Sequence, residues 1–114
     1  MDKKQSKEVK AGDISADNLL VKNKNDNIDD TFCYQLFEEN YFDTDKLQLL
    51  INFVSAKKLD RNEADILQWI IEDVDNCFIY HHDDNDYYRI TNYSNTIEDA
   101  WNNHWRTELM ASLS

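Results

Sequence analysis

Apolar residues recur at every third or fourth position along most of the chain after residue 29, which is the spacing of helices that bury one face. The pattern predicts helices over 30–41, 44–58 and 60–77, and a last helix from residue 96 onward. The third predicted helix opens with Asp60 and Glu63, the spacing of a capping box. Its core face holds Ile66, Leu67, Ile70, Ile71, Val74 and Cys77. We predict an all-α fold, a compact bundle of four to five helices.

The segment 78–91 allows two interpretations. It can form a short helix after a polar break at 83–85, or a short hairpin that pairs 78–82 with 87–91. Its tyrosine and isoleucine residues favour the hairpin through their β-propensity, whereas the missing glycine and the helical neighbours favour the helix. We favour the helix and keep the hairpin as the alternative.

Few sizeable apolar residues occur in 1–28, and they follow neither helical nor strand periodicity. Such a segment cannot offset the entropy of ordering by burying apolar surface. We therefore predict a flexible N-terminal arm over 1–28 and an acidic helical domain over 29–114. Leu19, Leu20 and Val21 could still dock on that domain.

The negative charge is concentrated in the predicted domain. The whole chain carries 12 basic and 23 acidic residues, a net charge of -11, whereas residues 1–28 carry six lysines and five acids. Nucleic acid and anionic membranes repel an acidic domain. We therefore expect a basic protein as partner, no direct binding of nucleic acid and no membrane association.

The composition excludes several other classes. One glycine and no proline in 114 residues argue against turn-rich β folds and glycine-rich phosphate loops. No apolar run follows the N-terminal lysines, so we expect no signal peptide and a cytoplasmic protein. We expect Cys33 and Cys77 to be reduced structural residues rather than a disulfide.

The histidine residues show no pattern typical of a metal or catalytic site. His81 and His82 are adjacent, and adjacent side chains diverge on a helix or a strand, so one ion cannot easily bind both. His104 shares a predicted helix face with Ile97 and Trp101, which is typical of a core histidine. We expect no catalytic residue, no metal and no cofactor.

Trp69 lies on the polar side of the third predicted helix. At about 100° per residue it falls among Asp65, Glu72, Asp73 and Asn76 rather than on the apolar face. One interpretation is that another helix or the N-terminal arm covers Trp69. The other is an exposed aromatic anchor ringed by carboxylates, a composition expected of an interface hot spot.

We predict that the partner-binding residues combine acidic and aromatic side chains of the third helix and the segment after it. They are Asp65, Trp69, Glu72, Asp73, Asp75, Asp83, Asp84, Asp86, Tyr87 and Tyr88. Carboxylates three or four residues apart on a helix are about 6 Å apart along its axis. This spacing is close to that of successive phosphates in duplex DNA.

In size, helical character and distribution of acids, residues 29–114 resemble the small acidic DNA-mimic proteins that phages use against host restriction and other DNA-directed defences. The segment Asp75–His82, at the end of an acidic helix, is similar to short phage proteins of that kind. The resemblance implies a non-enzymatic inhibitor without a cofactor that occupies the basic nucleic-acid-binding surface of a bacterial defence nuclease complex, of the restriction or CRISPR type. The lysine-bearing arm departs from a pure mimic.

Two other functions fit the same composition. An immunity protein that neutralises a basic toxin nuclease would use acidic and aromatic residues over a smaller patch. A small adaptor subunit would use them inside a larger assembly. The sequence also leaves open that the protein forms a homodimer.

Overall fold

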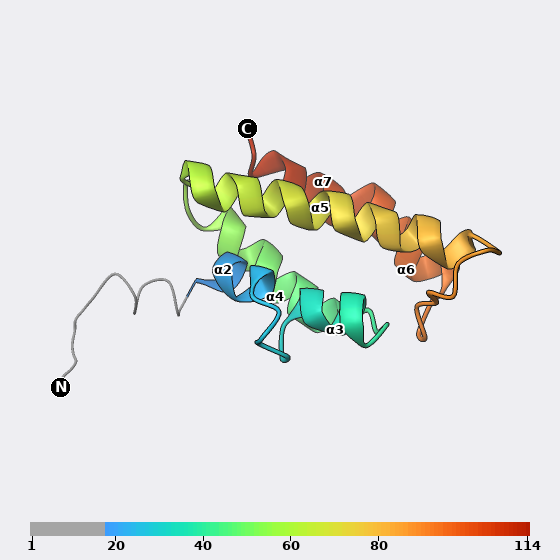
Figure 1. The fold of residues 1–114 in the computed structure, drawn as a ribbon. Helices are drawn as coiled ribbons and strands as arrows, with labels where there is room; N and C mark the ends of the chain where they lie inside the picture. Colours follow the sequence, from blue (N-terminus) through green and yellow to red (C-terminus); the bar gives the residue numbers. More distant parts are fainter. Residues whose placement is uncertain (1–17) are drawn as a thin grey trace.

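The fold consists of helices joined by short connections (Figure 1). A computed structural model describes residues 18–114. Its helices are α2 (Leu19–Lys24), α3 (Phe32–Glu38), α4 (Thr44–Ser55), α5 (Arg61–His82), α6 (Asn95–Ala100), the π-helix η1 (Trp101–Trp105) and α7 (Arg106–Ala111). The last three follow one another without a break and form one helical run. The described residues contain no β-strand, which confirms the predicted all-α fold.

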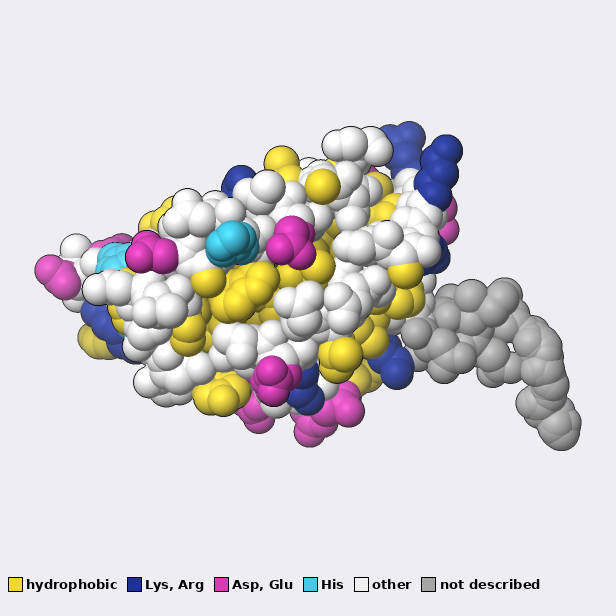
Figure 2. All heavy atoms as spheres, turned by 180° about the vertical axis from the view of Figure 1, so that it is seen from behind, with side chains coloured by type: hydrophobic (Ala, Val, Ile, Leu, Met, Phe, Trp, Pro, Cys, Tyr) yellow, Lys and Arg dark blue, Asp and Glu magenta, His cyan; other side chains and the backbone are white. Residues whose placement is uncertain are grey.

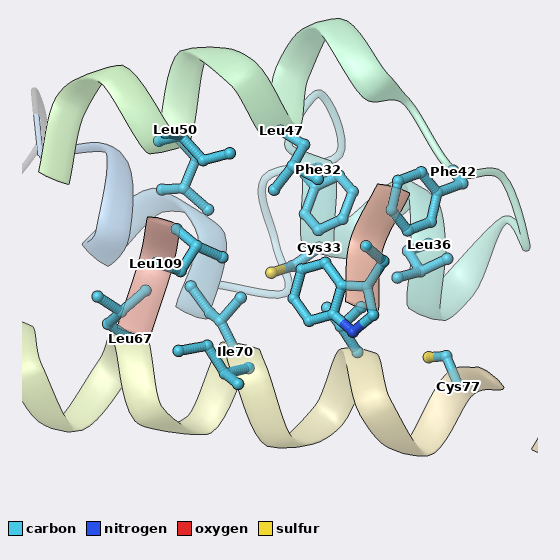
Figure 3. Close-up of a cluster of buried hydrophobic side chains, with 14 of the residues drawn as sticks. Phe32, Cys33, Leu36, Phe42, Leu47, Leu50, Leu67, Ile70, Cys77 and Leu109 are labelled. Atoms are coloured by element: carbon cyan, nitrogen blue, oxygen red, sulfur yellow. The ribbon is translucent and has the colours of Figure 1, made fainter. Parts of the chain in front are cut away.

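The hydrophobic core lies where α7 packs against α4 and α5, with α2 and α3 closing over α5 from the other side. In Figure 3, Leu47 and Leu50 from α4 face Leu67 and Ile70 from α5, and Leu109 from α7 lies between them. All five side chains are fully buried. Each such burial contributes about 1.5–3 kcal/mol to folding, so the periodic faces found in the sequence hold the bundle together.

The longest helix, α5, begins as predicted. The Asp60 carboxylate accepts a hydrogen bond from the Glu63 N–H at 2.8 Å, and the Glu63 carboxylate accepts one from the Asp60 N–H at 2.9 Å. The helix continues to His82, more than a turn beyond its predicted end. Between residues 18 and 114, no helix combines the length and the apolarity needed to cross a membrane.

The predicted N-terminal arm, residues 1–28, includes residues that belong to the folded body. α2 packs against α3, α4 and α5, and Leu20 is fully buried between them. The folded body therefore includes the residues from 18 onward. The remaining part of the predicted arm, residues 1–17, lies outside the described residues.

Two asparagines order α2 through contacts that no periodic pattern reveals. Asn18 caps the helix, and its Nδ2 donates a hydrogen bond to the Glu63 carboxylate at 2.7 Å. The buried Asn23 accepts a hydrogen bond from the Cys33 N–H at 2.9 Å. Buried polar groups need such partners, so a segment with few apolar residues is fixed by specific polar contacts.

The 83–94 loop forms neither the favoured short helix nor the alternative hairpin, because α5 takes up the residues that a hairpin would need for its first strand. The loop bonds instead to the chain after α3. The Thr91 N–H donates to the backbone oxygen of Asn40 at 2.7 Å. Asn92 exchanges two hydrogen bonds of 2.8 Å with the backbone of Phe42. A contact between distant parts of the sequence therefore decides the loop conformation.

The π-helix η1 changes which residues of the last helical run face the core. A π-helical turn holds more residues than an α-helical one, so the side chains after Trp101 are rotated from their α-helical directions. Trp101 and Leu109 are both fully buried, although an α-helix would set them about 80° apart around its axis. His104 is exposed. The prediction of a core histidine was wrong because it assumed a regular helix.

Candidate partner-binding site

A cleft of about 430 Å³ opens on the surface where α2 and α3 meet α5. Figure 1 shows the elements that contribute its lining, with α2 and α3 along one side of α5. Its lining residues are Asn23, Lys24, Asn25, Asp26, Cys33, Tyr34, Phe37, Glu38, Trp69, Asp73, Asn76, Cys77, Tyr80 and Tyr88. We call it the Trp69 cleft. The structure brings three of the predicted partner-binding residues together here, namely Trp69, Asp73 and Tyr88.

One stripe of α5 forms a wall of the Trp69 cleft. Trp69, Asp73, Asn76 and Tyr80 recur at positions i, i+4, i+7 and i+11, so they share one side of the helix. Phe37 from α3 packs edge-on against Trp69, with ring centroids 5.7 Å apart. The wall therefore places two polar side chains between two aromatic ones.

Trp69 is half-buried and not an exposed anchor. Phe37 covers part of the ring, and Lys24 at the end of α2 places its Nζ 3.8 Å from the ring centroid. A cation at this distance is attracted by the electron-rich face of the indole. Of the two interpretations for Trp69, the structure supports the covered one, with α2 and α3 as the cover.

The Trp69 cleft carries more negative than positive charge. Asp26, Glu38 and Asp73 line it, against the single ammonium group of Lys24. Burial raises the pKa of Asp73, the nearby Lys24 lowers it and Glu72 raises it. The cleft therefore combines a partly desolvated carboxylate with an aromatic wall.

The inner end of the cleft holds Cys33 and Cys77, which are buried and not disulfide-bonded. Figure 3 shows them on α3 and α5 beside the core. Burial raises the pKa of Cys77 to about 11 and that of Cys33 still further. Tyr88 closes this end, and its hydroxyl donates a hydrogen bond to the backbone oxygen of Leu36. Thiols held in the protonated form are poor nucleophiles, so these cysteines act as structural residues.

The other predicted acids of α5 lie outside the cleft. Asp65 and Glu72 are exposed. Asp75 lies on another flank of the helix, where its carboxylate accepts a hydrogen bond from the Trp101 indole at 2.8 Å and pairs with Arg106 at 3.0 Å. The Asp75 carboxylate thus links the last helical run to α5, and its role as a partner contact stays a prediction.

The remaining predicted residues occupy the turn after α5. Asp83 and Asp84 are exposed, and Tyr87 is the most exposed large side chain of the described residues. The Asp83 and Asp86 side chains each accept a backbone N–H two residues on, at 2.9 and 2.8 Å, which fixes the turn. The turn therefore presents carboxylates and one tyrosine at the end of the molecule.

Acidic side chains are spread over the surface in groups. Figure 2 shows the face behind that of Figure 1, where acidic groups lie at the end formed by the 83–94 loop and along both edges. Hydrophobic and uncharged side chains separate them. Along α5, Asp65 and Glu72 are about 10 Å apart along the axis, from a rise of about 1.5 Å per residue.

Two histidines and a tyrosine form a cluster where the end of α5 meets α6. His81 Nδ1 accepts a hydrogen bond from the Ile90 N–H at 3.0 Å, and its ring stacks on Tyr93 with centroids 4.1 Å apart. His82 Nε2 lies 2.8 Å from the Glu98 carboxylate, which also accepts a hydrogen bond from the Tyr93 hydroxyl. In residues 18–114 no three metal-ligating side chains converge.

The His81 contact makes the stability of the protein depend on pH. Burial, followed by His82 and Arg89, lowers the pKa of His81 below its usual 6.5, whereas Glu98 acts in the opposite direction. The folded state therefore prefers neutral His81, and the unfolded state binds the proton more readily. We expect the free energy of unfolding to fall as the pH drops through 6.5 toward the lower pKa of the folded state, as measured by urea denaturation.

His81→Asn is the control for this dependence, because its amide oxygen can accept the Ile90 N–H but does not titrate. The variant should show a flatter pH profile between 7.5 and 5.5. An equally steep profile in the variant would assign the effect to other groups.

The sequence-based prediction missed several residues of the cleft. Tyr80 shares the stripe of Trp69, and a helical wheel continued past residue 77 would have revealed it. Phe37 and Lys24 reach the cleft from other helices, so no local pattern indicates that they meet Trp69.

The geometry of the Trp69 cleft and of the 83–86 turn defines the candidate site. Comparisons with protein-family models, with curated proteins and with solved structures found no match. The function is therefore inferred from the charges, contacts and burial of this chain alone.

Proposed function

We propose that this protein is a non-enzymatic inhibitor that occupies the basic nucleic-acid-binding surface of a bacterial defence nuclease complex, of the restriction or CRISPR type. The observation that carries the proposal is the excess of carboxylates beside accessible aromatic side chains. Residues 18–114 carry 19 Asp and Glu against eight Lys and Arg, and two ion pairs form among these residues, Lys57–Glu63 and Arg106–Asp75.

Carboxylates and aromatic residues would have separate roles in such a complex. The exposed Asp83 and Asp84 would steer the inhibitor toward a basic surface and set its orientation. The exposed Tyr87 beside them and the Trp69 cleft would supply desolvated contact area, which contributes most of the binding free energy at interfaces.

A second candidate function is an immunity protein for a basic toxin nuclease. The separation of the acidic groups into patches favours it, since imitation of duplex DNA needs closely spaced charges along one surface. Inhibition of a toxin nuclease would need only one such patch.

The proposal is tested by measuring DNA cleavage by purified restriction enzymes, CRISPR effectors and toxin nucleases in the presence of this protein. We expect inhibition of one enzyme, relief of that inhibition by excess duplex DNA, and an affinity that falls about tenfold or more between 50 and 200 mM salt. Binding that does not change with salt concentration, or inhibition that duplex DNA does not relieve, would contradict the proposed function. Inhibition of a toxin nuclease alone would favour the immunity function.

Matched double variants locate the binding surface. Asp83→Asn with Asp84→Asn removes two charges at the turn, and Asp99→Asn with Glu108→Gln removes two exposed charges from the last helical run. Only the first pair should weaken inhibition. Equal weakening by both pairs would indicate that overall charge, rather than the turn, is responsible.

A further inference from the structure

The Trp69 cleft already holds a cation from its own chain. The Lys24 Nζ lies 3.8 Å from the centroid of the Trp69 ring, well within the distance at which cation–π attraction operates. Lys24 is the last residue of α2, whose attachment to the body depends on Leu20 and Asn23 instead. Its side chain can therefore leave the ring without disrupting the packing of α2.

The cleft is larger and more acidic than one ammonium group requires. Its volume is about 430 Å³, and three carboxylates line it, from Asp26, Glu38 and Asp73. The aromatic surface of Trp69 continues into Phe37, which packs against it edge-on. The cleft therefore offers negative charge and aromatic surface to a larger cationic group than the Lys24 ammonium.

Among protein side chains, arginine fits these features best. Its guanidinium group is planar, stacks on aromatic rings and pairs with a carboxylate through two hydrogen bonds, and it is more weakly hydrated than the lysine ammonium group. We infer that the Trp69 cleft is a binding site for an arginine side chain of the partner protein, and that Lys24 occupies the Trp69 ring until the arginine displaces it. This inference rests on the proposed function in taking the partner to be basic.

The binding site is tested on the full chain with a short glycine–arginine peptide, a matched lysine peptide and a matched citrulline peptide, which is neutral. The readout is the NMR signal of the Trp69 indole N–H, assigned with Trp69→Phe. The arginine peptide should shift this signal saturably, the lysine peptide should bind several-fold more weakly, and the citrulline peptide should have no effect. The signal of the fully buried Trp101 should stay in place.

Displacement of Lys24 is tested with two single variants of α2. Lys24→Gln should bind the arginine peptide about threefold or more tightly, because the competing cation is gone. Lys22→Gln removes the same charge from the same helix but does not line the cleft, and its affinity should rise less than twofold. Equal affinities of the two variants, or a Trp69 signal that the arginine peptide leaves unchanged, would overturn the inference. Melting temperatures of both variants control for unfolding.

The inference and the proposed function can fail separately. Saturable arginine binding in the cleft without inhibition of any nuclease would contradict the proposed function but support the arginine site. Undiminished inhibition by the Asp73→Asn and Trp69→Phe variants would contradict the arginine site but support the proposed function as an inhibitor.

Discussion

Replacing Trp101 by alanine should destabilise the protein by about 3–5 kcal/mol, the range found when large aromatic side chains are removed from well-packed cores. Trp101 is fully buried at the junction of α6 and the π-helix. Its indole N–H donates to Asp75, so truncation would leave a cavity and remove a donor from a carboxylate that also pairs with Arg106. Because domains of this size are stable by about 5–15 kcal/mol, much of the fold's stability would be lost.

Guanidinium denaturation followed by circular dichroism measures the effect. Trp101→Phe keeps one six-membered ring but loses the N–H donor and the rest of the indole, so it should cost about 1–3 kcal/mol, less than the alanine variant. Tyr87→Ala, at a fully exposed position, should change the free energy of unfolding by less than about 0.5 kcal/mol. A Trp101→Ala variant as stable as Tyr87→Ala would show that the last helical run does not depend on Trp101.

Replacing Glu63 by glutamine should cost about 1–3 kcal/mol at neutral pH, the range for loss of a buried charged hydrogen-bond partner. Glu63 is almost fully buried, and its carboxylate binds the Lys57 ammonium group, the Asn18 amide and the Asp60 N–H. These contacts join the end of α4, the start of α5 and the start of α2. A neutral side chain keeps the shape but loses the ion pair.

The contribution of the Glu63 carboxylate to the free energy of unfolding should disappear at low pH. Burial opposes ionisation of Glu63, but the hydrogen bonds from Lys57, Asp60 and Asn18 outweigh it and lower the pKa from 4.5 to about 2. Since the folded state has the lower pKa, the contribution is complete above pH 4.5 and is lost as the pH falls toward 2.

The difference in unfolding free energy between wild type and Glu63→Gln should shrink across that range, as measured by urea titrations from pH 6 to 2.5. Glu108→Gln, at an exposed site, is the control and should match the wild type at neutral pH. A difference that does not vary with pH would contradict the assigned role of the Glu63 charge.

The sequence contained enough information to predict the main helices and their buried faces. The spacing of Ile66, Leu67 and Ile70 predicted the core side of α5, and the Asp60–Glu63 pair predicted its start. These features are local, because a helix brings together residues three and four positions apart in the sequence.

The features that could not be predicted depend on distant contacts. α2 is short and weakly apolar, and Asn18 and Asn23 order it by bonding to residues far along the chain. The Trp69 cleft requires three helices to meet, which no pattern within a single helix indicates. The conformation of the 83–94 loop is determined by hydrogen bonds to the chain after α3 rather than by the β-propensity of the loop residues.

The π-helix η1 has a consequence for the length of the last helical run. Trp101 and Leu109 are eight positions apart and both face the core. Seven positions would bring two residues to the same side of a regular α-helix within about 20°. The run therefore has the length of a regular helix with one additional residue, and the wide turn accommodates it.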